Sequence, residues 1–178
     1  METREYTVYK FDELSDEGKE KAIERYYDIN VDHDWWEHIF DDAERIGLKI
    51  TSFDLDRGRH AKGRLTQGIP AVITDILSEH GPDCDTYKFA IEWKQRYRNE
   101  AARWLWELRK NYPDERNELD DYLDSRQYDD LEHDFLRELL EEYSCILQRE
   151  YDYLTSEEAV TESFVANEYD FTEDGRID

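Results

Sequence analysis

Apolar residues recur at steps of three and four along most of the chain, a spacing that predicts helices with one buried face. One helix is expected to open at Ser15, whose hydroxyl is suited to cap the first turn. The other helices are predicted over 34–46, 69–77, 85–111, 119–124, 130–154 and 155–167, the last of them opened by a capping box at residues 155–158. The pattern therefore predicts a mostly helical protein.

Shorter segments alternate between apolar and polar residues and predict strands at 6–9, 48–55, 60–65 and 169–171. The alternation slips by one residue near Thr51 and Ser52, and a β-bulge at this point would return the apolar side chains to one face. Strands at both ends and a hairpin in the middle predict an α+β fold. We expect one small antiparallel sheet built from the terminal strands and the central hairpin, within a single domain over residues 1–178.

The composition is compatible with a folded, cytoplasmic protein. Only 38% of the 178 residues are hydrophobic, but 14% are aromatic, and aromatic side chains bury a large area each. The N-terminus carries no apolar signal core, and no stretch has the length of a membrane span. Cys84 and Cys145 are far apart in sequence and are expected to be reduced thiols.

The charge of −24 is the most informative feature of the composition. It disfavours direct binding to nucleic acid and to anionic membranes, because both attract Lys and Arg. Residues 1–56 hold 17 acids and 7 bases, residues 57–110 hold 7 and 11, and residues 111–178 hold 23 and 5. The anions are therefore concentrated towards the two ends of the sequence, around a basic middle.

Two sets of acids recur at helical steps of three and four residues, so that each set is predicted to form a carboxylate ladder on one helix face. Steps of this size rise about 4.5–6 Å along a helix, which is comparable with the spacing of phosphates along a nucleic-acid strand. The predicted partner-binding residues are Asp34, Glu37, Asp41 and Glu44 in the first set, and Asp114, Glu118, Asp121, Asp124, Asp130, Asp134, Glu138 and Glu141 in the second region.

Other interpretations of the charges remain open from sequence alone. Each stripe is also compatible with an ordinary solvated helix face, and a generally acidic surface is typical of adaptation to high salt. The basic segment Arg57, Arg59, His60, Lys62 and Arg64 is compatible with a small anion site at a hairpin tip. We favour the other interpretation, in which the segment neutralises part of the acidic surface and protects an edge strand.

Candidate catalytic chemistry is sparse. His33, Asp34 and His38 resemble a metal-binding cluster, but a step of five separates the two histidines, whereas zinc-binding helices use a step of four. His80 and Cys84 flank a short loop as a second potential ligand pair without further partners. The sequence contains no phosphate-binding glycine loop and no nucleophile motif. We therefore expect a protein that is not an enzyme and that needs no metal or other cofactor.

Five segments are informative together, over residues 6–17, 34–36, 53–58, 150–159 and 166–175. They resemble a family of small acidic proteins carried by phages, prophages and other mobile elements, some of which are labelled antitoxin-like. The resemblance implies a bacterial cytoplasm during phage or mobile-element activity, and it implies no catalytic residues.

The charge pattern and this resemblance together suggest a phage-type inhibitor that binds a basic, nucleic-acid-handling host defence protein of the restriction or CRISPR type. Its carboxylates would imitate the nucleic acid. One alternative is an antitoxin-like protein that masks a basic toxin, and another is a metal-dependent enzyme that uses His33, Asp34 and His38. Trp35 and Trp106 are expected to be exposed aromatic contacts for a partner. The sequence does not indicate an oligomeric state.

Overall fold

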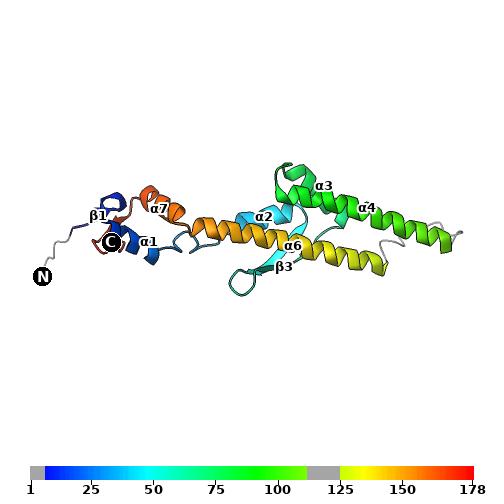
Figure 1. The fold of residues 1–178 in the computed structure, drawn as a ribbon, viewed down its shortest axis with the longest axis horizontal. Helices are drawn as coiled ribbons and strands as arrows, with labels where there is room; N and C mark the ends of the chain where they lie inside the picture. Colours follow the sequence, from blue (N-terminus) through cyan, green and yellow to red (C-terminus); the bar gives the residue numbers. More distant parts are fainter. Residues whose placement is uncertain (1–6, 112–124) are drawn as a thin grey trace. The chain divides into compact units, whose positions relative to one another are not determined.

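The computed structural model describes residues 7–111 and 125–178. Its elements, in chain order, are β1 (Tyr9–Lys10), η1 (Phe11–Glu13), α1 (Asp16–Arg25), α2 (Glu37–Arg45), β2 (Leu48–Asp54), β3 (His60–Leu65), α3 (Ile69–Glu79), α4 (Asp85–Asn111), α6 (Arg126–Leu154), α7 (Glu157–Ala166) and β4 (Asp170–Phe171) (Figure 1). The predicted α+β class with a helical majority is confirmed. The helix predicted over 119–124 lies outside the described residues.

The chain forms two compact units. The terminal unit combines Met1–Glu37 with Leu147–Asp178, and the central unit is His38–Ile146. Helix α6 contributes residues to both units. The single domain expected from the sequence stays a prediction.

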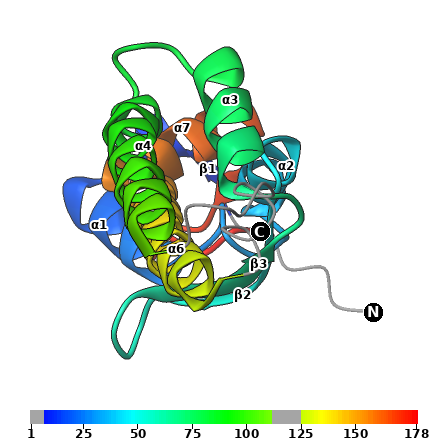
Figure 2. The same cartoon turned by 90° about the vertical axis from the view of Figure 1, so that its right-hand side faces the viewer.

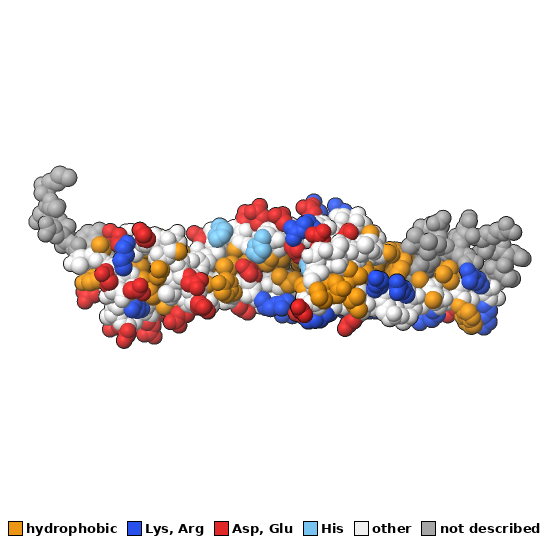
Figure 3. Space-filling model, turned by 90° about the horizontal axis from the view of Figure 1, so that it is seen from above, with side chains coloured by type: hydrophobic (Ala, Val, Ile, Leu, Met, Phe, Trp, Pro, Cys, Tyr) orange, Lys and Arg blue, Asp and Glu red, His pale blue; other side chains and the backbone are white. Residues whose placement is uncertain are grey.

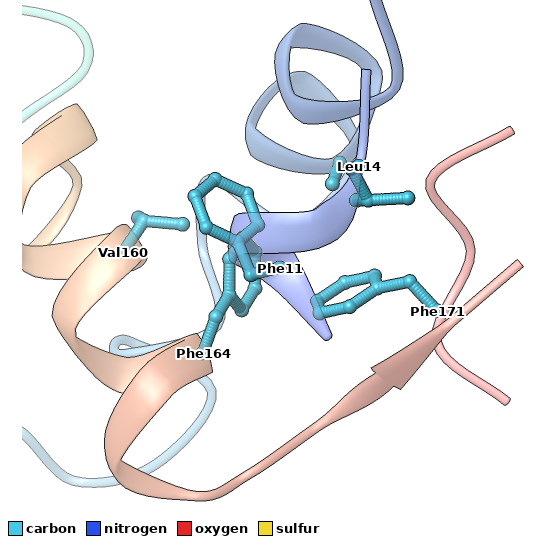
Figure 4. Close-up of a cluster of buried hydrophobic side chains, with 6 residues drawn as sticks. Phe11, Leu14, Val160, Phe164 and Phe171 are labelled. Carbon is cyan, nitrogen blue, oxygen red and sulfur yellow. The ribbon is translucent and has the colours of Figure 1, made fainter. Parts of the chain in front are cut away.

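The terminal unit is held together by an aromatic cluster from both ends of the sequence. Phe11 lies in η1, Phe164 in α7 and Phe171 in β4, and each is at most 6% exposed. Their ring centroids are 5.0–6.0 Å apart, in tilted or edge-to-face arrangements that aromatic pairs prefer. Figure 4 shows these rings pointing toward one another, with Leu14 and Val160 beside them. Beside the cluster, β1 and β4 pair antiparallel.

At the start of α1, glycine occupies position 18, where a capping box would have glutamate. Ser15 caps the helix as predicted, because its hydroxyl accepts a hydrogen bond from Gly18 N at 3.1 Å. Position 18 would hold Glu in a capping box, but a Cβ there would come within 3.1 Å of Glu173 O. Gly175 has a φ of +74°, and its own Cβ would lie 2.5 Å from Gly18 O. The two glycines therefore allow the C-terminal turn to contact α1 directly.

The cap of α7 differs by one residue from the sequence prediction. Thr155 ends α6, since its backbone N–H and its hydroxyl both donate to Tyr151 O at 3.0 and 2.8 Å. Ser156 is therefore the N-cap of α7, and its hydroxyl accepts from Ala159 N at 3.3 Å. Because Ala occupies the third helical position, the expected capping box is absent from this helix.

The central unit is organised around the packing of α4 on α6, which run alongside each other in Figure 1. Trp93 of α4 stacks edge-to-face on Phe135 of α6 with a centroid distance of 5.0 Å. The Trp93 indole N–H also donates to Glu138 Oε2 at 2.9 Å, so its polar atom is satisfied within the core. Helix α3 packs beside α4 (Figure 2). The buried face of α3 consists of Ile69, Val72, Ile73 and Ile76.

The hairpin of β2 and β3 confirms the predicted bulge but not the predicted sheet. Ile50 pairs with Gly63 and Ser52 pairs with Lys62, so that Thr51 is the extra residue at the slip in the pattern. However, among the described residues β1 pairs with β4, which also forms an isolated bridge from Phe171 to Ile177, and β2 pairs only with β3. The described strands thus form two two-stranded sheets, because the terminal strands and the hairpin belong to different compact units.

Helix α2 begins later than the sequence pattern predicts. The helix starts at Glu37 and ends at Arg45, before Gly47 with its φ of +83°. Trp35 precedes the helix and is only 7% exposed, since it packs on Trp36 and Tyr151. The expectation that Trp35 is an exposed contact is therefore wrong. Trp106 is exposed as expected, at 62%. None of the helices in the described ranges is long and apolar enough to cross a bilayer.

Replacement of Phe164 tests the aromatic cluster. Phe164→Ala is expected to lower the free energy of unfolding by about 3–5 kcal/mol, because a buried ring is removed and a cavity remains. Val165→Ala on the same helix is the control, since Val165 is 52% exposed and its replacement should cost about 0.5 kcal/mol or less. Urea denaturation followed by tryptophan fluorescence measures both. Equal losses would show that the cluster is not the core of this unit.

Replacement of Gly175 tests its close approach to α1. An alanine at a positive φ costs about 1–2 kcal/mol by itself, and Gly58→Ala provides that reference because Gly58 has a φ of +108° with open space around it. Gly175→Ala is expected to cost more than Gly58→Ala, since its Cβ also meets backbone atoms of Gly18 and Ala22. If the two variants had the same urea midpoint, the close contact of Gly175 with α1 would be contradicted.

Candidate functional site

The folded chain concentrates its negative charge in the terminal unit. The described part of this unit, residues 7–37 and 147–178, holds 20 acids and 6 bases, a net charge of −14. The described part of the larger central unit holds 19 acids and 15 bases, a net charge of −4. Figure 3 shows mainly acidic side chains on the surface around α1 and α7. The two ends of the sequence therefore contribute to one acidic unit.

A regular carboxylate ladder lies on α1. Asp16, Glu20 and Glu24 follow one another at steps of four residues, which places them on one helix face about 6 Å apart along the axis. All three are exposed, and they line an open groove of about 640 Å³ together with Glu157 from the start of α7. Lys19 and Ile23 complete the lining. The groove thus combines four carboxylates with one lysine and one apolar side chain.

Three bases of the terminal unit form ion pairs with acids outside the groove. Lys21 pairs with Glu17 at 2.6 Å, and this hydrogen bond holds the pKa of Glu17 below its ordinary value. Lys10 pairs with Asp170 at 2.9 Å, and Arg176 pairs with Asp174 at 3.0 Å.

Two further bases near the groove also have contacts of their own. Lys19 lies over the Phe11 ring at 5.9 Å, and Arg25 donates to Asp174 O at 3.2 Å. Within the described ranges, none of the four groove carboxylates forms an ion pair. Their charge is therefore available to a cationic partner.

The first predicted ladder is only partly formed. Glu37, Asp41 and Glu44 are exposed on α2 at steps of four and three residues, as expected. Asp34 is also exposed but precedes the helix, because α2 starts three residues later than predicted. None of these four acids forms an ion pair with another residue in the parts of the chain that the structure describes.

The second predicted ladder, on α6, is largely neutralised by arginines from the basic middle of the sequence. Arg96 of α4 contacts Asp134 at 3.0 Å and Glu138 at 3.2 Å, and Arg137 contacts the same two carboxylates at 3.2 and 3.4 Å. These contacts, with Arg137 first, keep the pKa of Asp134 below its ordinary value. Two carboxylates that bind two arginines form an internal network and offer little net charge to a partner.

Arg59 extends this neutralisation to the hairpin. Its guanidinium contacts Glu141 at 2.6 Å, which joins the segment before β3 to α6. This ion pair supports the interpretation that Arg59 of the basic segment neutralises an acid of the surface. Asp130 is exposed and has no ion pair within the described ranges. The remaining predicted ligands of a partner, Asp114, Glu118, Asp121 and Asp124, lie outside the described residues.

The predicted metal-binding cluster is not assembled on one helix. His33 and Asp34 precede α2, whereas His38 lies within it, so the expected step of four between Asp34 and His38 along a helix is not formed. Across residues 7–111 and 125–178, no three His, Cys, Asp or Glu side chains are close enough to bind a metal ion together.

Sequence reasoning missed the α1 groove because it ranked acidic segments by local density. The signal was nevertheless present in the predicted pairing of the terminal strands. Strands that pair bring the segments beside them into one unit, so this pairing would have placed the acids of residues 16–24 and residue 157 in the same small unit. Adding charge over paired segments would have found this surface.

Comparisons with models of protein families, with curated protein sequences and with solved structures found no match to this chain. The resemblance to phage-encoded acidic proteins therefore stays a prediction. The charges, contacts and exposure of the side chains are the observations from which function is inferred.

Replacement of Arg96 tests the neutralisation of α6. Its guanidinium also lies 4.1 Å from the centroid of the Trp93 ring, so Arg96→Gln loses a cation–π contact worth about 0.5–1 kcal/mol in addition to two ion pairs. Arg98→Gln removes an exposed arginine of the same helix and should change the free energy of unfolding by about 0.5 kcal/mol or less. The network would have to be rejected if both replacements gave the same midpoint.

Proposed function

We propose that this protein binds a basic, nucleic-acid-handling protein and presents carboxylates where that partner normally receives phosphates. The observation that carries the proposal is the ladder of Asp16, Glu20 and Glu24, which forms no ion pair with the described residues. It lies in a unit whose described part has a net charge of −14. A surface of this kind accelerates association with a cationic partner and makes binding sensitive to salt.

The ladder has the spacing that imitation of a nucleic-acid strand requires. Carboxylates about 6 Å apart on a helix form a rigid row of single negative charges. A groove that is lined with Lys and Arg to receive phosphates would accept such a row, and polynucleotide would then be displaced by competition. The exposed acids of α2 (Glu37, Asp41 and Glu44) provide a second set, at steps of four and three residues.

The class of partner follows from the resemblance of the sequence to phage-encoded proteins. In the cytoplasm of an infected bacterium, the basic complexes that handle nucleic acid and oppose a phage are restriction and CRISPR-type enzymes. We propose such a defence complex as the target. Inhibition would then require no catalytic residue on this chain, because occupation of the nucleic-acid channel is sufficient.

The test is capture from a bacterial lysate on immobilised protein, with identification of the captured proteins by mass spectrometry. Nucleic-acid-binding proteins are expected to be enriched, to be released as salt is raised, and to be displaced by added duplex DNA or RNA. The binding of the purified target is then compared between charge variants. Captured proteins that bind no nucleic acid would contradict mimicry, and a toxin encoded beside this protein would favour the antitoxin interpretation.

The charge variants locate the surface. Glu20→Lys with Glu24→Lys is expected to weaken binding to the purified target by about tenfold or more, since two attractive charges in the groove become repulsive. Glu92→Lys with Glu107→Lys changes the net charge by the same amount on exposed positions of α4 and should have a much smaller effect. Asp41→Lys with Glu44→Lys measures the contribution of α2. Equal weakening by all three pairs would show that only total charge matters.

A further inference from the structure

A group of four polar side chains in the central unit takes no part in the acidic surface. Cys84 directly precedes α4, His80 follows α3, Asp42 belongs to α2 and Tyr143 to α6. Cys84 Sγ lies 3.6 Å from His80 Nδ1, and His80 Nε2 lies 3.6 Å from Asp42 Oδ2. The Tyr143 hydroxyl donates to the same carboxylate oxygen at 2.7 Å. A thiol, an imidazole and a carboxylate are thus arranged in sequence, in the order found in activated nucleophiles.

The imidazole of His80 is buried and incompletely satisfied. Its side chain is 10% exposed, and Nε2 has no hydrogen-bond partner among the described residues. A buried polar atom without a partner is costly. The other ring nitrogen, Nδ1, faces Cys84 Sγ at 3.6 Å. The imidazole is therefore placed to accept the proton of the Cys84 thiol.

Asp42 is fixed in place by partners other than His80. Arg45 contacts its Oδ1 at 2.7 Å and also lies 3.8 Å from Glu79, which ends α3. Burial first, and then the charge of Asp42, raise the pKa of Tyr143 well above its ordinary value, so that its hydroxyl remains a donor to Asp42. The charged and titratable groups around the imidazole are thus Asp42, Arg45, Glu79, Cys84 and Tyr143.

The thiol is accessible from solvent and lies at a helix start. Cys84 is partly exposed, and the preceding residues 81–83 are exposed. A Cβ added at Gly81 would meet no atom within 4 Å, so there is open space beside the loop. Lys88 N donates to Cys84 O at 3.2 Å, which makes Cys84 the N-cap of the 27-residue helix α4. The positive end of a helix dipole favours a thiolate.

We propose that Cys84 is a thiol-modification site that forms mixed disulfides with low-molecular-weight disulfides, with His80 as the proton acceptor. Cys84 Sγ attacks one sulfur of the small disulfide, so that the new Cys84–sulfur bond forms as the disulfide bond breaks. The Sγ proton passes to His80 Nδ1 and then to the leaving thiolate, which departs as a thiol. The small disulfide is the oxidant, and no other reactant is needed. This site is independent of the proposed acidic surface.

The test measures the reaction of Cys84 with the disulfide probe 5,5′-dithiobis(2-nitrobenzoic acid) in the full chain. Cys145→Ser leaves Cys84 as the only thiol, and the same variant unfolded in urea provides the rate of an ordinary cysteine. At pH 7 the folded protein is expected to react about tenfold or more faster than the unfolded one, because His80 accepts the thiol proton as Cys84 attacks. Oxidised glutathione should then give the mixed disulfide, detected as an added mass on the intact protein.

Variants distinguish activation from simple exposure. His80→Asn in the Cys145→Ser background is expected to remove the rate advantage, and circular dichroism establishes whether this variant is folded. Tyr143→Phe is the second variant, since it preserves packing but removes a donor to Asp42 Oδ2. It should lower the rate at pH 7 and change the pH dependence of the reaction, which simple exposure of the thiol would not do. Asp42 is a positioning residue in this scheme. A folded protein that reacts no faster than the unfolded one, or a folded His80→Asn that keeps the full rate, would overturn the proposal.

Discussion

The contact among Phe11, Phe164 and Phe171 is the interaction on which the terminal unit depends. It joins a segment from the start of the sequence to one from its end, and both segments carry an excess of acids. Like charges repel, so burial of apolar area must supply the free energy that keeps these segments together. Without this cluster, the carboxylates of α1 and Glu157 of α7 would have no reason to lie beside one groove.

The two units use their arginines and lysines differently. In the central unit, Arg59 and Arg96 extend to acids on α6 and bind the hairpin and α4 to that helix. In the terminal unit, Lys10, Lys21 and Arg176 contact acids outside the groove. The acids on α6 in the central unit are thus largely neutralised by arginines, whereas the groove carboxylates of the terminal unit form no ion pair with the described residues. Counting charges along the sequence cannot separate these cases, because an acid paired with arginine counts as much as a free one.

Local features of the sequence predicted the elements well. As predicted, Ser15 caps the start of α1, and Gly47 follows the end of α2 with a positive φ. The long helix α4 has the predicted bounds of 85–111, and the slip at Thr51 is a bulge. These signals act over a few residues. The separation of the hairpin from the terminal strands, the burial of Trp35 and the pairing of Glu138 with Arg96 depend on contacts between distant segments. No periodicity encodes such contacts, so that the internal network on α6 and the approach of Asp42 to His80 became visible only in three dimensions.

The pairing of Tyr9 with Phe171 determines when the acidic groove can form during folding. The contacts of the central unit close loops within residues 38–146, whereas β1 and α1 must wait for β4 before they can pack. Closure of so large a loop is slow compared with the formation of local helices. During synthesis on the ribosome, the central unit can therefore fold first, and the acidic groove arises only after the last strand has emerged.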